Sequence, residues 1–265
     1  MEANELISKI INVLQNSRLT INFNSSKLDF TSLLKKGEIY NCFRLSGRPN
    51  DLPAYNVGRD SIENSAFQLN NLTDSPYQKL AVTGGYSNSF NPLNRDFQGI
   101  SRPIYAALDF LGYKHGGASH YGKSFFVLND YVKHVCTYSP FDIYGNRFNS
   151  DYNKLCTFFS FENLIANCQN DFFGYNCFKS LINKANNTNA PIHSNYGKGA
   201  EGNYIESHIH GQVKIETDIK NIYISKSELQ EIYPKIDMNQ NLKLIKEVNS
   251  KFPRKSNQDF ILFTD

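Results

Sequence analysis

Tryptophan is absent from this chain of 265 residues, so its aromatic content comes from 20 phenylalanines and 16 tyrosines. Neither sign of charge dominates, because 28 Lys and Arg face 25 Asp and Glu. A net charge of +3 is too small to indicate a general nucleic-acid surface. No stretch approaches the roughly 20 apolar residues that a membrane span requires. We therefore expect neither a nucleic acid nor a membrane as partner.

Cysteines are few, odd in number and never arranged as CxxC: Cys42, Cys136, Cys156, Cys168 and Cys177. This pattern predicts neither a closed disulfide framework nor a zinc ribbon, and it favours a reducing compartment. Residues 1–30 have an acidic residue at position 2, Glu2, and lack a basic region followed by an apolar run. We therefore expect no ordinary secretory signal peptide. Their Asn and Ser content suits a signal read by a specialised injection apparatus.

Apolar residues at helical spacing predict four helices: one over the opening residues that ends near 16–18, and others over 60–69, 103–111 and 226–232. Aromatic and β-branched segments broken by turn formers predict strands at 39–45, across the region from 124 to 161, and after 203. Residues 184–203 carry little periodic apolar signal and read as a long exposed loop. We expect residues 1–265 to form a single domain.

The stretch YIESHIHG, at residues 204–211, contains the most informative pattern. Side chains two apart in a strand point to the same face, so Glu206, His208 and His210 share one face while Ile205 and Ile209 take the other. Such a polar face is either an exposed surface or the wall of a polar cleft. Two histidines and a carboxylate also make a divalent metal site a rival interpretation.

Five blocks in the same order resemble an uncharacterised bacterial family with RPxYGAL and ExxxHG motifs: GRDSIENSAF, SRPIYAALDF, GGASHYGKSFFVL, VCTYSPFD and YIESHIHG. That family is similar to the bacterial CHART effectors, which are threonine-specific ADP-ribosyltransferases of host ubiquitin. Ala106 stands where the wider family has Gly, and Arg44 where an acid is more usual. Both departures favour the effector branch.

The resemblance implies an α+β fold, ADP-ribosyltransferase-like, of two small and mostly antiparallel sheets with flanking helices and an NAD cleft between them. It implies Glu206 as the catalytic residue, which stabilises the positive charge that develops as nicotinamide leaves. Arg44, Tyr121, Thr137, Ser139 and His210 are the implied NAD-binding residues. No metal is required by this reaction.

The same resemblance implies an enzyme that a bacterium secretes into the host cell cytosol, where it acts as a monomer on a threonine of ubiquitin. His208 or His210 is expected to serve as a base, and residues 184–203 to contact the acceptor. Arg59 and Glu63, four residues apart, are most simply an exposed helix pair. A non-catalytic interaction protein on the same scaffold is a further alternative.

Overall fold

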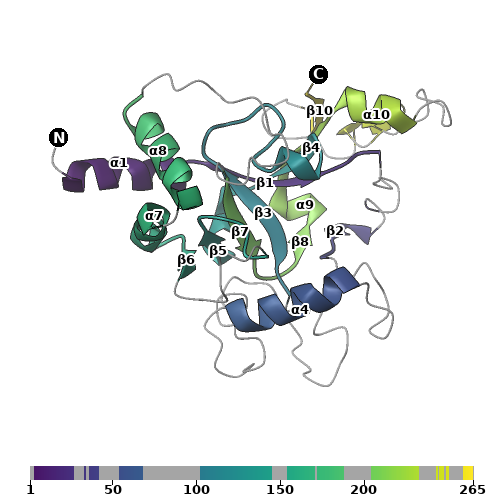
Figure 1. The fold of residues 1–265 in the computed structure, drawn as a ribbon. Coiled ribbons are helices and arrows are strands. Elements are labelled where there is room, and N and C mark those ends of the chain that lie inside the picture. Colours follow the sequence, from purple (N-terminus) through teal and green to yellow (C-terminus); the bar gives the residue numbers. More distant parts are fainter. Residues whose placement is uncertain are drawn as a thin grey trace.

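The computed structural model describes residues 3–26, 33, 36–41, 54–67, 102–144, 154–170, 172–187, 204–232, 243, 245–247, 249–250 and 259–264. Within them lies a sheet of eight strands in the order β10-β9-β4-β1-β3-β7-β5-β6, with a separate pair β2-β8 (Figure 1). Every pairing in the large sheet is antiparallel except that of β10 with β9. The strands are β1 (Arg18–Phe23), β2 (Glu38–Ile39), β3 (Ile104–Asp109), β4 (Ser124–Leu128), β5 (Cys136–Ser139), β6 (Cys156–Thr157), β7 (Ile205–Ile209), β8 (Val213–Lys214), β9 (Ile219–Ile224) and β10 (Ile261–Phe263).

The α+β class is confirmed, but the prediction of two small sheets is wrong. One large sheet forms because β3 and β7, far apart in the sequence, pair along five residues, from Ile104↔Ile209 to Leu108↔Ile205. This pairing joins strands from both halves of the chain. The second sheet contains only the short pair of β2 and β8.

The segment 103–111 is the strand β3 and not the predicted helix. Five of its six residues are buried, because β3 lies inside the sheet and its two faces pack against different apolar clusters. A strand covered on both faces reads as a nearly continuous apolar run, and periodicity alone does not separate such a run from a buried helix.

The helices are α1 (Ala3–Gln15), α4 (Ala54–Phe67), α7 (Phe161–Asn170), α8 (Phe172–Ala185), α9 (Ile215–Asp218) and α10 (Lys226–Ile232), with short 3₁₀ turns η2 (Ser119–Tyr121) and η3 (Asp130–Val135). The predicted helices at the start of the chain, near residue 60 and at 226–232 are confirmed. The strands predicted between residues 124 and 161 are confirmed as β4, β5 and β6, but the helices α7 and α8 that follow them were not predicted. None of these helices in the described part of the chain could traverse a bilayer.

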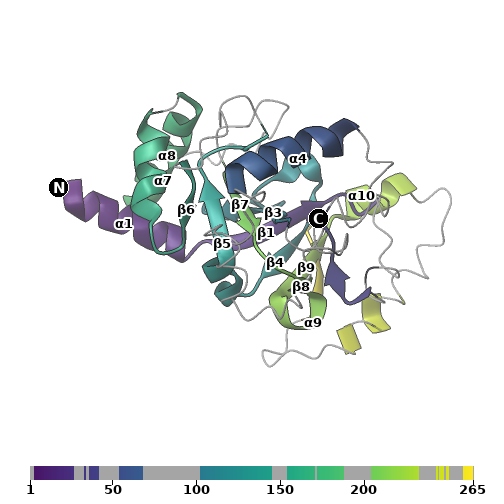
Figure 2. The ribbon, with the colours of Figure 1, turned by 90° about the horizontal axis from the view of Figure 1, so that it is seen from below.

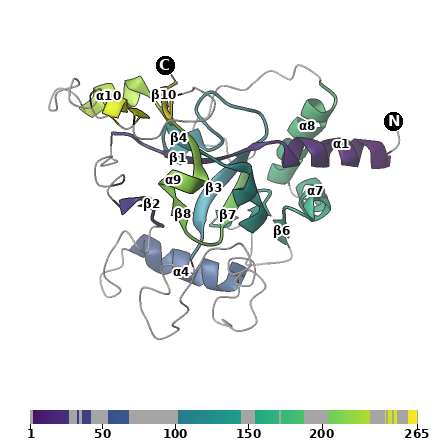
Figure 3. The same cartoon turned by 180° about the vertical axis from the view of Figure 1, so that it is seen from behind.

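The two faces of the sheet have different covers. Figures 1 and 3 show α1, α7 and α8 gathered beside one another, and the main apolar core contains residues from all three together with Ile205 and Ile209 of β7. Figure 2 shows α4 lying against β3 and β7. Beneath α4 a smaller apolar cluster, which includes Phe67 and Phe141, leaves room for the polar groups described next.

Candidate functional site

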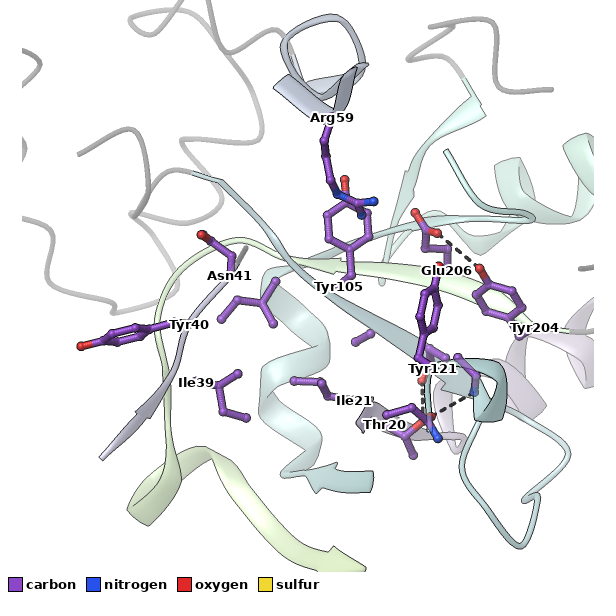
Figure 4. Close-up of a pocket in the computed structure, with 15 residues that line it drawn as sticks. Thr20, Ile21, Ile39, Tyr40, Asn41, Arg59, Tyr105, Tyr121, Tyr204 and Glu206 are labelled. Atoms are coloured by element: carbon purple, nitrogen blue, oxygen red, sulfur yellow. Dashed lines mark hydrogen bonds between the residues drawn. The ribbon is translucent and has the colours of Figure 1, made fainter. Parts of the chain in front are cut away.

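A cavity of about 430 Å³ opens on the α4 side of the sheet, bounded by β1, β3, β7, α4 and η2 (Figure 4). Sites for small molecules usually have this order of size and a mostly apolar lining with a few polar groups. Tyr40, Tyr105, Tyr121 and Tyr204 supply aromatic walls. The charged residues of its lining are Arg59 and Glu206.

Glu206 is 3% exposed and sits in the middle of the sheet, opposite Ala107 of β3 and Ser139 of β5. Its Oε1 lies 2.8 Å from Nε2 of His208, and it accepts a bond of 3.3 Å from the backbone N–H of Ile143. The hydroxyl of Tyr204 donates to Oε2 over 3.4 Å. Burial raises the pKa of Glu206 to about 7, although Arg59 and these donors favour the charged form.

Behind Glu206 a hydrogen-bonded chain continues into the protein. Nδ1 of His208 lies 3.2 Å from Oγ1 of Thr137, which is 2.8 Å from Nε2 of His210. The ring of Phe67 on α4 packs edge-on against both imidazoles. Burial lowers the pKa of each histidine to about 3, so both are neutral. The polar face predicted for this strand exists, and it is a buried wall instead of an exposed surface.

The same hydrogen bonds bear on the metal alternative. Both ring nitrogens of His208, and Nε2 of His210, are engaged by Glu206 and Thr137. Among the residues that the structure describes, no group of three His, Cys, Asp or Glu is arranged to hold a metal ion. The donor arrangement therefore favours a hydrogen-bonded wall over a ligand set.

Across the cavity, α4 contributes a buried ionic cluster. Nε of Arg59 lies 3.2 Å from Oε1 of Glu63, and Nη1 of Arg102 lies 3.5 Å from Oε2. The Tyr105 hydroxyl donates to Glu63 over 2.9 Å, and the Arg59 guanidinium lies 3.5 Å from the centre of the Tyr105 ring. Arg59 and Glu63 are 6% and 0% exposed, so their interpretation as an exposed helix pair was wrong. Burial raises the pKa of Glu63 to about 7 against the two arginines.

The predicted site residues divide into three groups. Glu206 and the half-exposed Tyr121 line the cavity. Thr137, Ser139 and His210 are buried in the wall beside or behind Glu206; the Ser139 hydroxyl donates 2.6 Å to the carbonyl of Phe141 and so shapes the turn after β5. Arg44 lies outside the described residues, as do residues 188–203 of the predicted acceptor loop; Lys184 and Ala185 belong to α8.

Three residues at or beside the cavity were not predicted as site residues from the sequence: Arg59, Tyr204 and Asp142. Asp142 follows β5 and is only partly buried, and its carboxyl interacts with that of Glu206. Burial and the charge of Glu206 raise the pKa of Asp142 to about 6. All three stand in the blocks GRDSIENSAF, VCTYSPFD and YIESHIHG, but the sequence interpretation assigned none of them to the site.

Fold and site together define an α+β protein with a large, mostly antiparallel sheet and a buried carboxyl group at an aromatic cavity. The chain belongs to the DUF3626 family, whose model matches residues 31–245 and which is described as a protein of unknown function. The match spans all of the cavity except the residues that β1 contributes. No curated protein matches the chain.

Proposed function

We propose that this protein is a mono-ADP-ribosyltransferase that transfers ADP-ribose from NAD to a protein side-chain hydroxyl. The observation that carries the proposal is the position of Glu206, a buried carboxyl that faces an aromatic cavity from the middle of the sheet. A carboxylate fixed there stabilises the cation that develops at C1′ of the ribose as the bond to nicotinamide breaks. Protein dipoles that are already oriented make such stabilisation effective.

The remainder of the cavity suits the other parts of NAD. Tyr121, which is 52% exposed, offers a face on which a nicotinamide or adenine ring stacks, and Tyr105 and Tyr204 form aromatic walls of the same cavity. Arg59, held over the Tyr105 ring, provides a cation for the pyrophosphate. Thr137, Ser139 and His210 then act on the orientation of Glu206 and β5, while Arg44 remains a second candidate for the phosphates.

The acceptor in this proposal comes from the resemblance to the CHART effectors. It is a threonine of ubiquitin, and the enzyme acts as a virulence factor in the cytosol of a host cell. A hydroxyl acceptor is a weak nucleophile at neutral pH. The reaction therefore depends on forming the ribosyl cation first and on an acceptor oxygen placed close to it.

Two measurements on the full chain test the proposal in order. The first is thermal unfolding with NAD, for which a ligand at about 100 times its Kd adds roughly 2.7 kcal/mol to the free energy of unfolding. The second is incubation with NAD and ubiquitin, followed by intact mass and by quantification of free nicotinamide. We expect one added ADP-ribose and its loss in the Glu206→Gln variant.

The outcomes separate the parts of the proposal. Absence of both NAD binding and nicotinamide release overturns the transferase assignment. Labelling of another protein in a cell lysate, with ubiquitin unmodified, keeps the transferase and removes ubiquitin as acceptor.

A further inference from the structure

Transfer to a hydroxyl needs a group that removes the hydroxyl proton, and the two histidines of β7 do not fit that role. His208 and His210 are 0% and 2% exposed, and the chain through Thr137 engages them. Their environment keeps them neutral and makes them weak bases. An acceptor approaching from outside would have to pass Glu206 to reach His208, because the Nε2 of that ring already contacts Glu206.

Asp142 lies beside Glu206 and is less deeply buried than it. The turn after β5 brings it there: Ser139 lies opposite Glu206 in the sheet, and the backbone N–H of Ile143 donates to Glu206 Oε1 over 3.3 Å. Oδ1 of Asp142 accepts a bond of 2.7 Å from the N–H of Tyr144, which fixes the carboxyl. Asp142 is only partly buried and Tyr144 is 36% exposed, so this turn runs from the site to the surface.

We propose that Asp142 is the general base that takes the proton from the acceptor hydroxyl, a role that rests on the proposed transferase function. The bond from C1′ of the ribose to the nicotinamide nitrogen breaks, and its electron pair leaves with neutral nicotinamide. The acceptor oxygen then bonds to C1′, and its proton moves to the Asp142 carboxylate. Glu206 faces the ribosyl cation throughout, so the two carboxyl groups have separate tasks.

The charges around Asp142 suit this division. The groups that act on it are Glu206, which opposes its ionisation, and Arg59 on α4, which favours it. Burial and the charges of both carboxyl groups raise the pKa of Tyr204, whose hydroxyl donates to Glu206. Because two neighbouring carboxyls resist double ionisation, one of the two keeps its proton to a higher pH than it would alone. The positive charge of the nicotinamide ring of NAD, and then of the ribosyl cation, favours the doubly ionised pair in which Asp142 is a base.

The test compares Asp142→Asn with the wild-type chain, because an amide keeps the acceptor for the Tyr144 N–H and removes the basic oxygen. Nicotinamide release from NAD is measured with water or ubiquitin as acceptor, with and without sodium azide. Azide is a nucleophile that carries no proton to remove. The ribosyl cation re-forms NAD unless an acceptor captures it, so without the base we expect Asp142→Asn to lose about 10²-fold or more in net release to water and in transfer to ubiquitin, the usual range for a general base. Azide restores release in this variant and gives ADP-ribosyl azide, detected by mass.

Two controls give the result its meaning. Asp130→Asn changes a carboxyl on η3 that is 78% exposed and pairs with Lys133, and it leaves all rates unchanged. Glu206→Gln loses release and is not rescued by azide, because formation of the cation is lost. Wild-type rates in Asp142→Asn, or a loss that azide does not restore although NAD still raises its melting temperature, overturn the role of Asp142. Failure of the wild-type chain to release nicotinamide at all overturns the proposed function itself.

Discussion

Thr137 on β5 lies directly opposite His208 on β7, and its hydroxyl oxygen is 3.2 Å from Nδ1 of that ring. The contact fixes the direction of a hydrogen-bonded chain. When Glu206 is ionised, Nε2 of His208 must donate to it, so Nδ1 accepts from Thr137. Thr137 in turn accepts from Nε2 of His210. When Glu206 is protonated, every bond in the chain can reverse.

Thr137→Val is expected to remove this coupling. Valine has a similar shape but leaves ring nitrogens of both histidines without the hydroxyl, which costs about 1–3 kcal/mol in the free energy of unfolding. Nicotinamide release is expected to fall as well, because the His208 ring that contacts Glu206 is held less firmly. Urea unfolding and the release assay measure the two effects. Thr137→Ser keeps the hydroxyl and is the matched control; equal behaviour of the two variants would show that the chain has no role.

The pH dependence of stability gives a second test of Glu206. Its pKa is raised in the folded state from 4.5 to about 7, so the folded state binds the proton more tightly than the unfolded state does. Stability from this group is present below about pH 4.5 and is lost as pH rises to about 7. Relative to wild type, Glu206→Gln should therefore become more stable by about 2–3 kcal/mol across that window.

His208 and His210 oppose this trend in the wild-type protein. Their lowered pKa values make the folded state gain stability as pH rises from about 3 to 6.5. The difference between Glu206→Gln and wild type, measured by urea unfolding at each pH, isolates the carboxyl. Glu216→Gln changes an exposed glutamate and serves as the control. A flat difference from pH 4 to 8 would place Glu206 in a solvated environment.

Local pattern predicted the part of the site that lies on a single strand. Alternation along YIESHIHG placed Glu206, His208 and His210 on one face, and that face is present. The pattern did not show whether the face was covered, because Phe67 and α4 come from a segment about 140 residues earlier. Nor did it find Arg59 or Asp142, whose partners Tyr105 and Glu206 are brought to them only by the sheet.

Gly122 explains how Tyr121 reaches the cavity. Its φ of 148° is a conformation that side chains rarely adopt, and a Cβ there would lie 2.1 Å from the backbone carbon and oxygen of Phe23 on β1. Gly122→Ala should therefore displace backbone and lower the free energy of unfolding by about 3 kcal/mol or more. Gly112→Ala, which has a φ of 70° and open space around it, isolates the strain alone, about 1–2 kcal/mol. Equal losses of urea stability in the two variants would contradict the close contact with β1.

Arg59→Lys tests whether the cation of α4 binds the pyrophosphate. Lysine keeps the charge but loses the planar fork that grips two phosphate oxygens and the flat face that stacks on Tyr105, now 3.5 Å away. We expect NAD affinity to fall about tenfold, which corresponds to about 1.4 kcal/mol in binding free energy. Calorimetric titration of both Arg59→Lys and Arg44→Lys with NAD separates the two candidates. Because Arg59 also pairs with Glu63, urea unfolding of the same variant shows whether a loss of affinity is a loss of fold. An unchanged Kd in Arg59→Lys, with a weakened one in Arg44→Lys, would return the phosphate contact to Arg44 and leave Arg59 as the counter-ion of Glu63.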